Sequence, residues 1–143
     1  TKPLVSGRHT IRDFHPENRA LSVPEVFMYS SNIGSARMGL MVGGGALEDF
    51  YKDLGFFAPV KIELEERGRP QYPDPWREIS TMTTSYGHGI SVTPLHVAAA
   101  ASAVVGAGRL LTPTLVLDRD RQKNATKNKG KTVVSPQTAH RMR

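Results

Sequence analysis

The sequence contains no cysteine, and aromatic residues make up only 7% of its 143 residues. The absence of cysteine excludes a disulfide scaffold and any thiol or cysteine-based metal site. The absence of cysteine fits both an oxidising and a reducing compartment, since neither requires this residue. The longest apolar-looking run, residues 97–105, is mostly alanine and far too short to cross a bilayer. A chain of this length can nevertheless bury a hydrophobic core.

The net charge of +6 comes entirely from the C-terminal part of the chain. Residues 1–117 carry 11 basic and 11 acidic side chains, whereas residues 118–143 carry eight basic and two acidic ones. The stretch 118–132 has no aromatic and almost no apolar residue, which predicts a mobile basic loop. Nucleic-acid binders more often spread basic residues over a folded face with interleaved aromatics. We therefore expect no nucleic-acid partner.

Helices are predicted from caps and from apolar spacing. Ser22 followed by Glu25 is a capping-box pattern, and the apolar residues after it recur at helical spacing. Three glycines at 43–45 should end that helix. The predicted helical segments are those from Ser22 to about Leu40, around Leu47–Leu54 up to Gly55, from Pro94 to Gly106, and from Pro136 onward.

Extended segments are expected between these helices, so the order is of the α/β kind. Residues 8–14 read as a short strand with Ile11 as the most apolar position. Residues 60–64 alternate between apolar and charged, as in a half-exposed strand or extended segment. The three prolines of 68–75 predict a surface loop, and 110–117 reads as an edge or bent strand because of an internal proline.

Two stretches carry residues suited to chemistry. In the first, Ser30 and Asn32 would point about 200° apart on an ideal helix and could not serve one pocket. An interruption of the helix would let both side chains lie on the same side of the chain, and Gly34 would lower the conformational cost of that interruption. The second stretch, 85–95, places paired glycines before a Thr-Pro helix cap.

Together these stretches resemble the transpeptidase domain of class B penicillin-binding proteins. The resemblance is strongest to the division-specific peptidoglycan D,D-transpeptidases (FtsI type) of alphaproteobacteria. It runs in order from about residue 8 to about 117 and more loosely to the end, and its longest specific run is G-H-G-I-S-V-T-P-L. The matching segments are Thr10–Phe14, Val23–Phe27, Ser30–Gly34, Leu54–Phe56, Tyr86–Leu95 and Pro113–Thr114.

The resemblance implies a partial α/β (α+β-like) penicillin-binding transpeptidase fold, β-lactamase-like, with helices packed on a mainly antiparallel sheet. Residues 1–143 would be the central portion of a single transpeptidase domain. It further implies septal cell-wall synthesis at the periplasmic face of the inner membrane, with an anchor outside these residues. The implied ligands and partners are peptidoglycan stem peptides, β-lactams and membrane proteins of the division machinery, with no cofactor and no metal.

Such enzymes use three motifs around one cleft: S-x-x-K, S-x-N and K-[ST]-G. By resemblance Ser30 and Asn32 are the catalytic and substrate-binding residues of S-x-N. The Ser30 hydroxyl would relay a proton beside the motif lysine, and Asn32 would hydrogen-bond that lysine or the bound amide. No serine in this chain has a lysine three positions later, and Lys131-Thr132 is followed by valine rather than glycine. The chain alone is therefore not expected to be acylated.

Other interpretations remain open at this level. The chain could be a non-catalytic binding module on the same scaffold or, with less support, a basic nucleic-acid-binding protein. Ser30 and Asn32 could mark only a helix interruption satisfied by local bonds. His88, between two glycines, is expected to be a packing histidine bonded to backbone. One loose group of possible metal ligands matches no firm spacing template: His9, Asp13 and His15.

Overall fold

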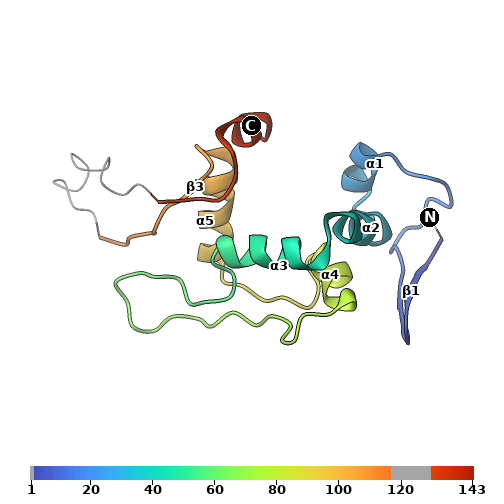
Figure 1. The fold of residues 1–143 in the computed structure, drawn as a ribbon, viewed down its shortest axis with the longest axis horizontal. Helices are drawn as coiled ribbons and strands as arrows, with labels where there is room; N and C mark the ends of the chain where they lie inside the picture. Colours follow the sequence, from blue (N-terminus) through green and yellow to red (C-terminus); the bar gives the residue numbers. More distant parts are fainter. Residues whose placement is uncertain (1, 117–129) are drawn as a thin grey trace. The chain divides into compact units, whose positions relative to one another are not determined.

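A computed structural model describes residues 2–116 and 130–143 (Figure 1). The chain divides into two compact units, and each is described by itself. Unit 1 consists of Thr1–Asp49 with Gln71–Ser91, and unit 2 consists of Phe50–Pro70 with Val92–Arg143. Helix α3, Gly44–Asp53, runs from the first unit into the second. No helix in the described part of the chain has the length and apolar character that a membrane crossing requires.

Unit 1 combines a β-hairpin with short helices. Its elements are β1 Leu4–Ser6, β2 His9–Ile11, α1 Val23–Met28, α2 Asn32–Val42 and α4 Glu78–Thr84. The two strands pair antiparallel, with Leu4 opposite Ile11 and Ser6 opposite His9. The turn between them uses Gly7 at a φ of 56°, a left-handed conformation that glycine adopts without steric cost.

The core of unit 1 is built from both the hairpin and the helices. Its buried members are Ile11, Ile33, Ala36 and Met82. The short strand predicted within residues 8–14 is present as β2, and its most apolar residue, Ile11, is only 5% exposed. This contact fixes the end of β2, and with it the residues that follow, against the start of α2.

The single helix expected from Ser22 to about Leu40 is wrong, because two helices occupy that range. The predicted capping box is present: Ser22 donates from its backbone N–H and its hydroxyl to Glu25 Oε2, at 2.8 and 2.7 Å. Helix α1 then ends at Met28, and Ser31 caps the new helix α2. Apolar spacing remains helical across the break, with Val26 of α1 and Ile33 of α2 both buried, so periodicity alone did not detect it.

Helix α4 has no counterpart among the predicted helices. Its residues are rich in serine and threonine, which favour caps and turns over helix interiors. In the structure their hydroxyls bond back to carbonyl oxygens of the preceding turn: Thr83 to Ile79 at 2.9 Å and Thr84 to Ser80 at 2.8 Å. Burial of this helix against α2 therefore outweighs weak local propensity.

The approach of α2 to α4 depends on Gly39. A Cβ atom at this position would lie 1.9 Å from Ser85 Oγ and 3.3 Å from the carbonyl oxygen of Thr81. Both distances are shorter than ordinary van der Waals contacts. The carbonyl belongs to the backbone, so it cannot move away by changing rotamer as a side chain can. The two helices therefore pack with no room for a side chain at this point.

We expect Gly39→Val to lower the free energy of unfolding by about 2–3 kcal/mol through overpacking. Thermal unfolding of the product of the complete open reading frame measures the change. Gly45→Val is the matched control, because a Cβ there meets nothing within 4 Å. Equal melting temperatures for the two variants would contradict the role given to Gly39.

Unit 2 is organised around helix α5, Pro94–Val105. Its other elements are β3 Arg109–Leu110, β4 Lys131–Thr132 and α7 Pro136–Arg141. The strands pair antiparallel, with Arg109 opposite Thr132, and α5 packs on both β3 and α7. The helices predicted to begin at Pro94 and Pro136 are confirmed, and their buried residues include Ala100, Ala103 and Ala139.

Strand pairing is limited in the other described segments that were predicted to be strands or extended. The strand expected over 110–117 is wrong: β3 ends at Leu110, and the hydroxyl of Thr114 donates instead to the Glu63 carboxylate. Residues 60–64 form no strand ladder with any described residue. Most of the predicted basic loop, 118–129, lies outside the described residues. Lys131 and Thr132, the last two residues of the predicted loop 118–132, form β4, and the Lys131 ammonium reaches Asp53 Oδ1 at 2.5 Å.

Candidate functional site

The two predicted site residues lie at the junction between α1 and α2. The Tyr29 N–H donates to the Glu25 carbonyl and the Ser31 N–H to the Val26 carbonyl, both at 2.9 Å, which closes the end of α1. Between them Ser30 is exposed and adopts a φ of 52°, in the left-handed region that non-glycine residues rarely occupy. The Ser30 N–H donates to the Phe27 carbonyl at 3.2 Å, so the two serine N–H groups form the Schellman ending of α1, in which the left-handed residue is usually glycine.

The expectation that Gly34 permits the interruption is wrong, because the break falls at Ser30 itself. Gly34 lies in the first turn of α2. A Cβ there would come within 2.5 Å of Val26 Cγ2. The glycine is therefore required for the close approach of α1 to α2, and the turn is made by other residues.

Ser31, the middle residue of the triplet, is a structural residue. Only 2% of it is exposed, and its hydroxyl accepts from the Gly34 N–H at 3.0 Å as an N-cap. The same hydroxyl donates to Asp13 Oδ2 at 2.9 Å. The other oxygen of that carboxylate, Oδ1, accepts from the Ile33 N–H at 2.9 Å. Sequence reasoning did not identify this role of Asp13.

Asn32 is the first residue of α2 and is half-buried. Its Nδ2 donates to the carbonyl oxygen of Arg12 at 3.1 Å. This bond ties one face of the amide to the backbone after β2, which fixes the orientation of the side chain. Ser30 and Asn32 are thus brought to one turn, with the first exposed and the second anchored.

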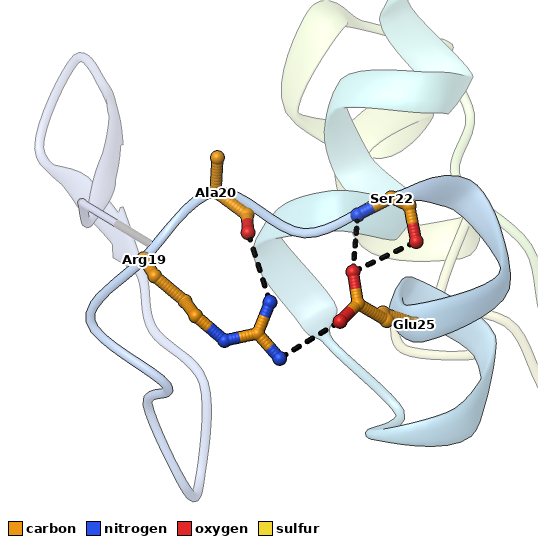
Figure 2. Close-up of polar contacts among 4 residues, drawn as sticks. All are labelled: Arg19, Ala20, Ser22 and Glu25. Atoms are coloured by element: carbon orange, nitrogen blue, oxygen red, sulfur yellow. Dashed lines mark hydrogen bonds and ion pairs between the residues drawn. The ribbon is translucent and has the colours of Figure 1, made fainter.

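An ion pair braces helix α1 next to this turn (Figure 2). Arg19 Nη2 lies 2.8 Å from Glu25 Oε1, while Arg19 Nη1 donates to the Ala20 carbonyl. The guanidinium carbon of Arg19 also lies 5.8 Å from the centre of the ring of Tyr29, the residue that precedes Ser30 in the sequence. Hydrogen bonds from Arg19 and then from Ser22 lower the pKa of Glu25 from its ordinary 4.5 to about 2. The same contact with Glu25 raises the pKa of Arg19.

This pKa shift predicts an acid-dependent contribution of Glu25 to stability. A folded-state pKa below the ordinary value means that the contribution is complete above about pH 4.5 and is lost as the pH falls through about 2. We expect Glu25→Gln to lower the melting temperature slightly at pH 7, since its ion pair with Arg19 is open to solvent and therefore weak, and less at pH 3. Glu66→Gln, at another exposed glutamate, is the control. A difference from wild type that widens on acidification would refute the prediction.

The second stretch follows helix α4 and turns on two glycines. Gly87 and Gly89 have φ values of 80° and 78°, and the His88 N–H donates to the Thr83 carbonyl at 3.0 Å. The prediction of a packed histidine is wrong for the side chain, which is exposed. The His88 ring instead lies parallel to that of Tyr86, with centres 6.2 Å apart. Burial raises the pKa of Tyr86.

In unit 2 the buried histidine is His96, which sequence reasoning missed. Its Nδ1 accepts from the Thr93 N–H at 3.2 Å, so Nε2 carries the proton and donates to the Ala58 carbonyl at 2.9 Å. The ring thus completes the N-cap of α5 and holds the 58–61 segment. It lines a largely apolar cavity of about 410 Å³ together with Leu54, Val60 and Leu110.

No metal-binding group of three or more ligands occurs within residues 2–116 and 130–143. In the loose group His9, Asp13 and His15, both carboxylate oxygens of the aspartate accept hydrogen bonds from the start of α2. That carboxylate therefore serves the fold of the turn.

Comparison with known proteins agrees with the geometry. The family model described as "Penicillin binding protein transpeptidase domain" matches residues 2–143. The chain is 38% identical over 114 residues to the "Probable peptidoglycan D,D-transpeptidase FtsI" of Caulobacter vibrioides, covering 80% of this chain and 19% of that protein. It is 29% identical over 145 residues to the "Probable peptidoglycan D,D-transpeptidase PenA" of Neisseria flavescens, covering 100% of this chain and 34% of that protein. The chain thus spans between about a fifth and a third of these relatives.

Solved structures give the same result for the fold. A peptidoglycan glycosyltransferase from Burkholderia ambifaria superposes with a TM-score of 0.79 at 26% identity, over 96% of this chain and 42% of that one. The transpeptidase domain of penicillin-binding protein 3 from Burkholderia pseudomallei superposes with a TM-score of 0.71 at 28% identity, over 94% of this chain and 37% of that one. The predicted fold class is confirmed, with its helices and small antiparallel sheets. The chain belongs to the penicillin-binding protein transpeptidase domain family.

Proposed function

We propose that this chain is the S-x-N-bearing part of a peptidoglycan D,D-transpeptidase that cross-links stem peptides by serine acylation. The observation that carries the proposal is the turn at Ser30. An exposed serine is held in a left-handed conformation two residues before an anchored asparagine, in a chain that matches a transpeptidase domain over residues 2–143. The left-handed φ itself belongs to the ending of α1, because the N–H groups of Ser30 and Ser31 donate to the Phe27 and Val26 carbonyls. The proposal of function rests on the exposed hydroxyl, the anchored asparagine and the family match.

The chemistry assigns each residue a step. A nucleophilic serine attacks the carbonyl carbon of the stem peptide, an ester forms, and the C–N bond to the leaving amine breaks. That amine needs a proton, and the nucleophile must lose one. The Ser30 hydroxyl, which both donates and accepts, relays the proton between them. The Asn32 amide holds the substrate amide or the motif lysine. A second amine then attacks the ester and completes the cross-link. β-Lactams take the place of the stem peptide in the first step.

The remaining parts of the proposal concern the longer protein. Residues 1–143 form the central portion of a single transpeptidase domain, with S-x-x-K before them and K-[ST]-G after them. The whole protein is anchored in the inner membrane, acts at its periplasmic face in septal synthesis, and works with membrane proteins of the division machinery. The likeness to the Caulobacter relative supports the division role. No metal or organic cofactor takes part.

The complete open reading frame tests this proposal. We expect its sequence to contain S-x-x-K upstream and K-[ST]-G downstream of these residues. We expect its purified product to bind fluorescent penicillin covalently, in a band that unlabelled penicillin removes. A complete reading frame without S-x-x-K, with no labelled product, would favour the non-catalytic binding module on the same scaffold.

A further inference from the structure

The largely apolar cavity lined by His96 lies within unit 2. Its volume is about 410 Å³. Small-molecule sites in proteins are typically about 300–1,000 Å³ in volume, so the cavity is large enough for a small organic ligand. The segments that contribute its walls all belong to unit 2, and they are residues 54–55 and 58–61, helix α5, residues 110–113, and residues 130–131.

Hydrogen bonds hold the walls of the cavity in place. His96 Nε2 donates to the Ala58 carbonyl at 2.9 Å, which ties the 58–61 segment to α5. One oxygen of the Glu63 carboxylate accepts from the Leu115 N–H at 3.0 Å, which ties the continuation of that segment to the chain after β3. Because these bonds fix the walls at several points, the walls are not free to close over the empty volume.

The interior of the cavity suits an apolar ligand better than water. Its lining includes the hydrocarbon side chains of Leu54, Val60, Ala99 and Leu110. Both ring nitrogens of His96 are already hydrogen-bonded. Among the described residues, no buried side-chain nitrogen or oxygen lacks a hydrogen-bond partner. Water in this interior would find few polar partners, and cavities of this kind bind apolar molecules.

The charged side chains of the lining are cationic. They are Lys61 and Lys131, and both are exposed, so their ammonium groups lie where the cavity meets solvent. The described lining contains no aspartate or glutamate. Lys131 is paired with Asp53 Oδ1 at 2.5 Å, so much of its charge is already offset. The positive charge of Lys61 therefore favours an anionic group at the mouth of the cavity.

We propose that this cavity binds a small molecule with an apolar body and one anionic group, of the medium-chain carboxylate class. The hydrocarbon chain occupies the interior beside α5, and the carboxylate lies at the mouth beside Lys61. This inference goes beyond the proposed function and does not depend on it, because Ser30 and Asn32 belong to unit 1 whereas the lining belongs to unit 2.

The experiment uses octanoate as the probe and the product of the complete open reading frame as the protein. Octanol has the same chain without the charge, so it separates the apolar contribution from the charged one. Isothermal titration calorimetry measures the dissociation constant of each ligand. We expect octanoate to bind saturably at one site per chain, with a negative heat capacity change because apolar surface is buried.

Two variants locate the ligand. Ala99→Phe fills the cavity from its α5 wall and should weaken both octanoate and octanol by about tenfold or more. Ala98→Phe places the same side chain on the exposed face of α5, is the matched control, and should change neither dissociation constant. Lys61→Gln should weaken octanoate about two- to fivefold and leave octanol unchanged, since exposed charge pairs are weak. Lys52→Gln, at an exposed lysine outside the lining, should have no effect.

Each outcome supports or overturns the inference. If octanoate does not bind the wild-type product saturably, the inference is overturned. If Ala99→Phe keeps the wild-type melting temperature and still binds octanoate with unchanged affinity, the ligand lies elsewhere and the inference is overturned. If Ala99→Phe does not fold, Lys61→Gln decides: a loss confined to octanoate supports the site, and no loss overturns it. Labelling by fluorescent penicillin is a separate measurement, so either proposal can fail without the other.

Discussion

The 143-residue chain alone is expected to take up no fluorescent penicillin covalently, whereas the complete reading-frame product is labelled. Acylation requires a serine activated by an adjacent base, which the family supplies as S-x-x-K. None of the serines in this chain is followed by lysine at the third position. Ser30 has no such lysine near it in sequence, and an unactivated hydroxyl is a weak nucleophile at neutral pH.

The measurement is a gel of purified chain incubated with fluorescent penicillin. Chain denatured before labelling and excess unlabelled penicillin control for non-specific attachment. A specific, competable band on the 143-residue chain would overturn the prediction. It would also mean that one of the serines present here is the nucleophile.

Ser30→Ala in the complete product is expected to lower the acylation rate constant by about 10²- to 10⁴-fold, the usual contribution of a positioned general acid or base. The nucleophile and the rest of the binding cleft are unchanged in this variant, so it should still bind penicillin non-covalently. The loss should therefore appear in the rate constant rather than in the dissociation constant. Stopped-flow labelling at several penicillin concentrations separates the two.

The left-handed conformation of Ser30 calls for a second variant. Ser30→Gly removes the hydroxyl but relieves the backbone strain at a φ of 52°. If the hydroxyl is what matters, the glycine and alanine variants lose rate equally. Ser102→Ala, on the exposed face of α5, is the matched control and should behave like wild type. Rates within tenfold of wild type for both Ser30 variants would refute the relay role.

The sequence predicted several local features correctly because their signals are local. The capping box of Ser22 with Glu25 and the Thr93-Pro94 cap each need only neighbouring residues. The ends of helices at Gly43 and Gly55 follow from positive φ values of 95° and 79°, which glycine adopts most readily. The resemblance that identified the family rests on such short ordered motifs.

Other features depended on contacts between distant segments. Helix α4 forms despite weak propensity because four of its residues are buried. The helix break at Ser30 is invisible to periodicity, since Val26 and Ile33 keep helical spacing across it. The anchoring of the turn by Asp13 joins residues 18 and 20 positions apart, a relation that no pattern in the sequence expresses.

The sequence by itself determined the family, the caps of α1 and α5, and the choice of Ser30 and Asn32 as the candidate site. Only the tertiary structure decided that Ser30 is left-handed, that Ser31 is a buried cap, and that Asp13 holds the turn. The physical reason is the range of the interactions. Caps and glycine turns are satisfied within a few residues, whereas Ser31 and the start of α2 are bound by a carboxylate that the end of a separate strand supplies.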